Sequence, residues 1–133
     1  MNVNEKVQYW IEIAEYDLKT TKVMLDGKRF LYVGFMCHQV IEKILKAYYT
    51  FRLEEVPPFI HNLPELAKKS KLYLEFSKEQ KDFIDQLDPL NIESRYPTYK
   101  NKLMKILTEN KCKQILNDTE VLFQWIKKKL IEN

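Results

Sequence analysis

The sequence predicts an all-α protein: an antiparallel up-and-down bundle of about five helices, one of them short. Apolar residues recur at helical spacing through every long segment, whereas sustained alternation with a period of two, the sign of strands, is absent. Only two glycines occur in 133 residues, too few to supply the turns of many short strands. Long helices with short connections favour antiparallel neighbours. We therefore expect one helical domain over residues 1–133.

The two longest predicted helices come first, at 4–26 and 30–52. Gly27 is expected to end the first helix in a left-handed conformation. The second helix must stop before Pro57 and Pro58, because proline cannot continue a helix and restrains the residue before it. One face of the first helix carries the apolar residues Val7, Trp10, Ile11, Ala14, Leu18, Thr21 and Leu25.

Capping residues mark the starts of the remaining helices. Asn62, Ser77 and Thr108 each precede a helical pattern and can bond its first free amides. A loop is expected at 91–100, followed by a helical turn at 102–107. The first, second and last helices should form the frame, the fourth should complete it, and the short third should cover one end. The predicted spans are 62–71, 77–88 and 108–131.

Composition narrows the class of protein. Apolar residues make up 45% and charged residues 31%, which is normal for a folded soluble domain. No run of about 18 apolar residues occurs, so no membrane span is predicted. The N-terminus has no apolar signal-peptide core, so a cytoplasmic location is expected. A net charge of +3 permits contact with phosphates but is mild for a duplex-DNA binder.

The sequence predicts neither a metal site nor a cofactor. Cys37 and Cys112 lie far apart, each inside a predicted helix, without a second cysteine or a histidine at metal-ligand spacing. Buried free thiols are the better interpretation. No glycine-rich loop is present to hold phosphates through backbone amides. If a nucleotide binds, side chains must hold it.

Histidine is the usual general base near neutral pH, so His38 and His61 are the first places to expect acid–base chemistry. His38 lies one helical turn before Glu42, which could orient its ring for catalysis, although such pairs are also ordinary features of helices. His38 is therefore a weak catalytic candidate. His61 stands just before a helix cap, where its ring is expected to pack or to bond backbone.

The loop that follows Ser94 looks least like plain structure. Arg95 can grip a phosphate through two parallel hydrogen bonds. Tyr96 and Tyr99 could stack on a base, and Pro97 would fix the order in which these side chains are presented. In the alternative interpretation the tyrosines fill the end of the bundle, and Arg95 pairs with Glu93.

A homodimer is expected from the second helix. Its apolar residues exceed what a single buried stripe needs, and an uncovered aromatic patch normally meets a partner. The candidate contact face holds Tyr32, Phe35 and Tyr49.

Four segments stand in a set order along the chain: Ala14-Glu15-Tyr16-Asp17-Leu18, Gln39-Val40-Ile41-Glu42-Lys43-Ile44-Leu45-Lys46-Ala47, His61-Asn62-Leu63 and Ser94-Arg95-Tyr96-Pro97. Together they resemble the HEPN family of small helical domains, over roughly residues 10–130. The resemblance implies a bundle of about five helices, commonly paired into a homodimer. Family members occur beside minimal nucleotidyltransferases, in toxin–antitoxin pairs, and as metal-independent ribonucleases.

The sequence differs from the family pattern at the motif that distinguishes the ribonuclease branch. The ribonuclease branch carries an arginine, four to six residues, then a histidine. Here Arg29 precedes His38 by nine positions, Arg52 precedes His61 by nine, and no histidine follows Arg95. The chain therefore looks more like the branch proposed to bind nucleotides or to accompany a nucleotidyltransferase.

The first hypothesis is a non-catalytic HEPN-like homodimer that binds a nucleotide, RNA or another phosphate-bearing ligand and works with a separate minimal nucleotidyltransferase. Arg95 would take the phosphate, Tyr96 and Tyr99 the base or ribose, and Lys43 and Lys46 would lend positive charge.

Two rival hypotheses remain open. The second is a ribonuclease toxin that uses His38 and Arg95 in an atypical arrangement across a dimer cleft. The third is a purely protein-binding, antitoxin-like or scaffold subunit, in which the Arg95 loop only seals the bundle.

Overall fold

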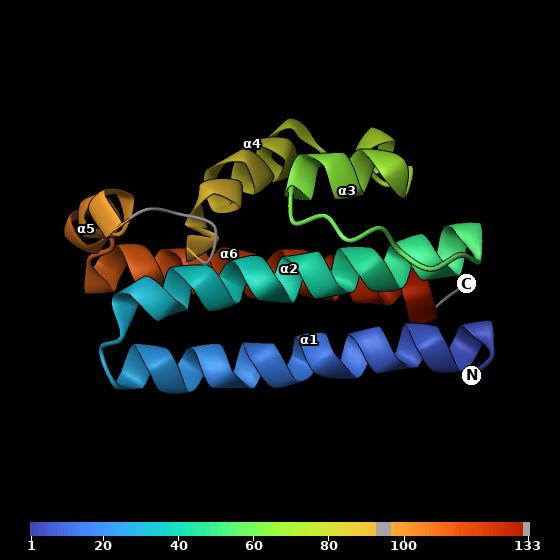
Figure 1. Ribbon diagram of the computed structural model, residues 1–133, viewed down its shortest axis with the longest axis horizontal. Helices are drawn as coiled ribbons and strands as arrows, with labels where there is room; N and C mark the ends of the chain where they lie inside the picture. Colours follow the sequence, from blue (N-terminus) through green and yellow to red (C-terminus); the bar gives the residue numbers. More distant parts are fainter. Residues whose placement is uncertain (93–96, 132–133) are drawn as a thin grey trace.

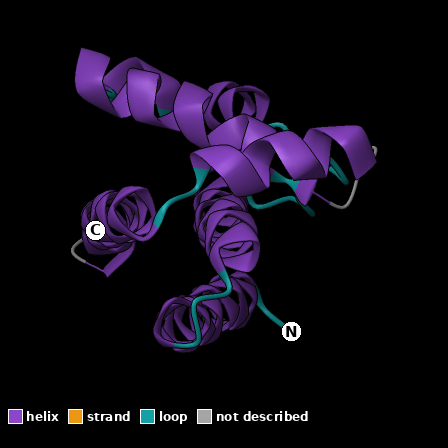
Figure 2. Cartoon of the chain, turned by 90° about the vertical axis from the view of Figure 1, so that its left-hand side faces the viewer, coloured by secondary structure: helices purple, strands orange, loops and turns teal. Residues whose placement is uncertain are grey.

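The computed structural model describes residues 1–92 and 97–131, and all regular structure in these ranges is helical. Three long helices lie side by side and form the frame (Figures 1 and 2). Helix α1 runs opposite to α2 and α6, and the chain returns between α2 and α6 through the shorter α3 and α4 (Figure 1). The predicted all-α up-and-down architecture is confirmed. The elements are α1 (Val3–Asp26), α2 (Phe30–Leu53), α3 (Leu63–Lys69), the 3₁₀ turns η1 (Tyr73–Glu75) and η2 (Asp88–Leu90), α4 (Lys78–Leu87), α5 (Pro97–Ile106) and α6 (Glu109–Ile131).

Helix α2 is the centre of the bundle. It packs against α1 and α6 and also contacts α3, α4, α5 and η2. Its surplus of apolar residues is therefore covered largely within the chain, because a central helix buries several faces. In the face suggested for dimer contact only Tyr32 is largely exposed, at 51%, while Phe35 and Tyr49 are half-buried. The homodimer stays a prediction.

The predicted capping residues do cap their helices. The Asn62 side chain accepts a hydrogen bond from the amide of Glu65 at 2.8 Å. Ser77 forms a reciprocal capping box with Gln80, and the Thr108 hydroxyl accepts from the amide of Lys111 at 3.2 Å. These bonds satisfy amides that a helix start leaves without partners.

Three local predictions were wrong. Gly27 has φ −82°, and the left-handed residue is Lys28 with φ 58°, one position later. The expected loop at 91–100 ends early, because α5 begins at Pro97; proline suits the first turn of a helix, where its missing N–H costs nothing. The short α3 packs along α2 beside α4, and α5 instead crosses an end of the long helices (Figures 1 and 2).

Both cysteines are buried and free, as predicted. Burial raises the pKa of the Cys37 thiol to about 12 and that of Cys112 to about 11. A thiol that stays protonated is a poor nucleophile and a poor metal ligand, so neither cysteine points to chemistry. Within residues 1–92 and 97–131, no helix combines the length and the apolar character that crossing a membrane requires.

Candidate functional site

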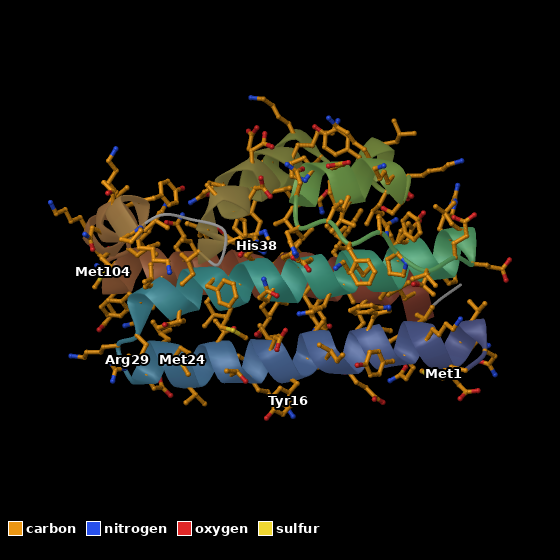
Figure 3. The ribbon with its side chains drawn as sticks, viewed as in Figure 1. Met1, Tyr16, Met24, Arg29, His38 and Met104 are labelled. Carbon is orange, nitrogen blue, oxygen red and sulfur yellow. The ribbon has the colours of Figure 1, made fainter. Side chains whose placement is uncertain are left out.

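Three polar side chains form a stripe along the middle of α2. The stripe meets η2 and the segment before α3 at one end and the Trp10 ring of α1 at the other. His38, Glu42 and Lys46 follow one another at a spacing of four residues, so they share one face of the helix. Their exposures are 0%, 2% and 6%, which is unusual for ionisable residues. Figure 3 shows His38 between α2 and the end of α4. We call these three residues the α2 polar stripe.

Glu42 is the centre of this stripe. Its Oε2 accepts a hydrogen bond from Lys46 Nζ at 3.0 Å, and its Oε1 lies 3.0 Å from Nδ1 of His61. His38 Nδ1 is 3.7 Å from the same Oε1, beyond hydrogen-bond distance. A buried carboxylate is costly unless it is paired, and here Lys46 supplies the countercharge. Glu42 therefore joins α2 to the segment that precedes α3.

His38 is sealed inside the bundle. Its Nε2 lies 3.8 Å from Oδ1 of Asp88 and makes no hydrogen bond to the described residues. That Asp88 oxygen already accepts from the backbone amide of Leu63 at 2.9 Å. Burial lowers the pKa of His38, against the opposing effect of the Glu42 and Asp88 carboxylates. The ring is neutral near pH 7, and no external phosphate can touch it in this conformation.

The buried His38 should make the protein less stable in mild acid. Its pKa lies below the ordinary value of 6.5 in the folded state, so below that pH the unfolded chain binds the proton more readily. The free energy of unfolding should therefore fall as the pH is lowered from about 7.5 to about 5. Urea unfolding at several pH values measures this slope, and His38→Gln should make it smaller. An equal slope in both proteins would show that other groups cause the acid sensitivity.

His61 differs from His38 in its access to solvent. Its side chain is 61% exposed, yet its Nδ1 is held by the buried Glu42. If Nδ1 carries the proton, the carboxylate fixes the ring orientation and leaves Nε2 as an acceptor. An exposed imidazole oriented by a carboxylate is the arrangement that general acid–base chemistry requires.

No local pattern in the sequence points to the pair of His61 and Glu42. We expected the partner of Glu42 to lie within its own helix, and expected His61 to pack or to bond backbone. The two residues are 19 positions apart and belong to different elements. Only the packing of the 54–62 segment against α2 brings them together, and nothing in the local pattern encodes that packing.

The predicted ligand-binding residues lie in several places. Lys43 Nζ bonds Asp17 of α1 at 3.4 Å and Gln39 at 3.1 Å, and Lys46 belongs to the α2 polar stripe. The Tyr99 hydroxyl, on α5, donates to the carbonyl of Pro89 at 3.1 Å. Arg95 and Tyr96 fall within residues 93–96, outside the described residues. The five-residue site therefore stays a prediction, and both lysines are already paired with acids.

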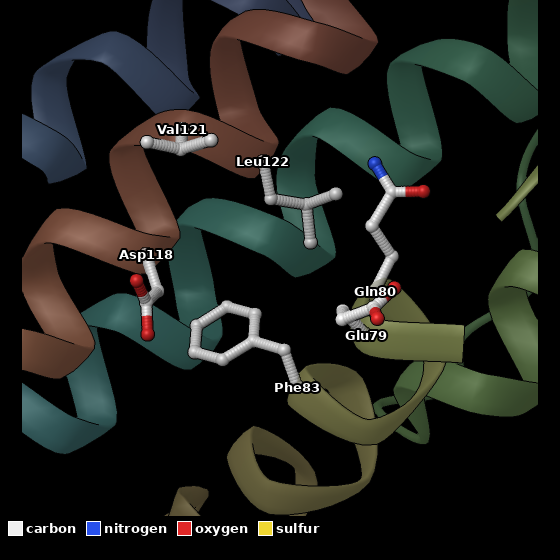
Figure 4. A pocket seen from close by; sticks show the side chains of 6 residues that line it. All are labelled: Glu79, Gln80, Phe83, Asp118, Val121 and Leu122. Atoms are coloured by element: carbon white, nitrogen blue, oxygen red, sulfur yellow. The ribbon is translucent and has the colours of Figure 1, made fainter. Parts of the chain in front are cut away.

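A separate pocket of about 230 Å³ lies between α4 and α6. Figure 4 shows Phe83, Val121 and Leu122 on its walls, with the carboxylates of Glu79 and Asp118 at its edges. None of the predicted ligand residues lines it. Two carboxylates repel a phosphate, so this pocket is a poor place for a nucleotide.

Comparison with known proteins finds a family model that matches nearly the whole chain. The sequence model described as HEPN domain matches residues 7–130. No curated protein and no solved structure matches the chain significantly. Among the described residues, no group of three or more His, Cys, Asp or Glu side chains is arranged to hold a metal ion. The match covers all the helices that carry the residues discussed above.

Proposed function

This chain belongs to the HEPN domain family, and on that basis we propose that it is a non-catalytic module that binds a nucleotide or another phosphate-bearing ligand. It would act as a homodimer with a separate minimal nucleotidyltransferase, as in a toxin–antitoxin pair. The observation that carries the proposal is the position of His38: the histidine in the middle of α2 is 0% exposed and therefore withheld from any substrate.

The family's ribonuclease chemistry needs two groups that this sequence does not carry at the usual spacing. A histidine must reach the reacting atoms, close to an arginine that holds the phosphate. His38 is buried, and no histidine follows Arg95 in the sequence. Binding without cleavage accounts for both features.

The ligand contacts would come from the Arg95 segment. A guanidinium can hold a phosphate in a bidentate manner, and aromatic rings can stack on a base. Because the Tyr99 hydroxyl donates to Pro89, the contribution of Tyr99 would come from its ring. Lys46 is neutralised by Glu42 and Lys43 by Asp17, so both would act weakly and at a distance.

An RNA assay tests the non-catalytic part of this proposal. Purified protein incubated with labelled single-stranded RNA should leave the strand intact on a denaturing gel, even where a mobility shift shows that the RNA is bound. Specific cleavage that disappears in both His38→Ala and Arg95→Ala would overturn the proposal and favour the atypical ribonuclease.

A second candidate function is favoured by the exposed His61. The contact between His61 and Glu42 would suit a general base in a ribonuclease that does not use His38 at all. Cleavage lost in His61→Ala but retained in His38→Ala would identify this case. Glu42→Gln should then lower the cleavage rate without abolishing RNA binding, because it weakens the orientation of the ring.

A further inference from the structure

Helix α1 carries a second apolar stripe that its own bundle does not use. The residues alternate at spacings of four and three, which is the heptad spacing of a coiled-coil contact line. The buried stripe of the same helix is a different set: Val7, Ile11, Ala14, Leu18 and Thr21. The second stripe, which we call the outer seam, consists of Tyr9, Ile13, Tyr16, Thr20 and Val23.

The outer seam is largely exposed, although Tyr9 at its start borders a pocket that also contains Thr50 of α2 and residues 55–57. Tyr9, Tyr16 and Val23 are 51%, 74% and 64% exposed. Figure 3 shows Tyr16 on the side of α1 opposite to α2. Three large apolar side chains in line along one helix are more than scattered surface apolar residues, and such a patch normally meets a partner. At about 1.5 Å per residue the seam is roughly 21 Å long.

Ion pairs of α1 show which of its flanks are already occupied. Asp17 pairs with Lys43 of α2 at 3.4 Å. Glu15 pairs with Lys127 and Lys22 with Glu120, both of α6, at 2.7 and 3.0 Å. The two long neighbours therefore cover adjoining sides of α1, and the outer seam lies on the remaining side.

We propose that the outer seam binds a second copy of this chain, with the two α1 helices antiparallel across a two-fold axis near the middle of the seam. Two-fold pairing brings one patch against itself, so the patch must be self-complementary. With Ile13 set against the partner's Tyr16, Tyr9 faces the partner's Thr20 and the symmetry repeats both contacts, so four of the five seam residues meet across the axis. Heptad helices pack in this way.

Charge complementarity supports a second copy as the occupant. Glu12 and Lys19 lie seven positions apart on the same flank of the seam, and neither forms an ion pair among the described residues. In the antiparallel arrangement Glu12 faces the partner's Lys19, and the symmetry repeats the pair. A parallel arrangement, or an unrelated protein, would not use this opposition. The outer seam is therefore the proposed contact surface of the expected homodimer, and pairing through it does not require a bound ligand.

Substitution at the middle of the seam tests the position of the interface. The wild-type chain should sediment as a dimer at micromolar concentration, and Tyr16→Glu, which places two carboxylates together at the axis, should give a monomer. Tyr32→Glu is the matched control: the same substitution at an exposed tyrosine of α2, which should leave the dimer intact. Circular dichroism establishes that each variant is folded. A wild-type monomer, or a dimer lost in Tyr32→Glu and kept in Tyr16→Glu, would overturn the proposal.

A charge exchange tests the partner and the direction. Glu12→Lys and Lys19→Glu should each weaken dimerisation about tenfold, since two attractive pairs become repulsive. An equal mixture of the two variants should regain dimers, because each chain then offers what the other lacks, and the double variant should also dimerise. If the mixture dimerises no better than either variant alone, the antiparallel pairing is wrong. Nucleotide titration of the same proteins reports separately on the proposed function.

Discussion

Replacing Glu42 by alanine is expected to lower the free energy of unfolding by about 3–5 kcal/mol, because it leaves a buried ammonium without its countercharge. Lys46 is 6% exposed and its Nζ lies 3.0 Å from Glu42. His61 also loses the carboxylate that holds its Nδ1. Urea unfolding followed by circular dichroism measures the loss.

Two control proteins separate burial from charge pairing as such. Glu109 pairs with Lys113 at the same spacing on α6, but both side chains are exposed, so Glu109→Ala should cost about 1 kcal/mol or less. Glu42→Leu combined with Lys46→Met removes the whole buried pair and should restore most of the stability lost in Glu42→Ala. If Glu42→Ala is no less stable than Glu109→Ala, then the charge pair of the α2 polar stripe is not buried.

Replacing Arg95 by alanine is expected to have a second large effect, on the binding of a nucleotide. Arg95→Ala should weaken nucleotide binding by about 1.5–3 kcal/mol, the scale of a charge-assisted hydrogen bond, while thermal stability stays nearly unchanged. Isothermal calorimetry with ATP measures the first quantity and a thermal melt the second. Arg95→Lys should recover only part of the loss, because an ammonium cannot reproduce the bidentate fork.

The opposite result has a definite meaning. If Arg95→Ala unfolds several degrees earlier and binds ATP like the parent, Arg95 has a structural role. The loop then seals the bundle, and the protein-binding scaffold becomes the better hypothesis.

The frame of the fold could be predicted because its information is local. Helical spacing and the capping residues Asn62, Ser77 and Thr108 lie within a few positions of the features they determine. The left-handed residue is Lys28 and not Gly27, because a helix can end with the left-handed residue at either of these neighbouring positions. The start of α5 was not predicted because Pro97 was expected within a loop, whereas proline also suits the first turn of a helix.

The site could not be predicted in the same way, because its contacts join distant parts of the chain. Glu42 meets His61 across 19 positions, and the Asp88 side chain bonds the amide of Leu63 across 25. The sequence placed Lys46 on the correct helix, but it could not show that Glu42 neutralises this lysine in a buried pair. Polar residues on a helix face look alike in sequence whether they are solvated or buried.

Calorimetric titration of the wild-type chain with ATP shows whether this protein binds a nucleotide, as proposed. Tripolyphosphate and adenosine should be titrated in parallel, to separate contacts to phosphate from contacts to the base. If the proposed function is correct, ATP binds saturably, and its binding weakens as salt is raised because a guanidinium–phosphate contact is screened by ions. Absence of binding by ATP and by tripolyphosphate, in a protein that is folded by circular dichroism, would contradict it.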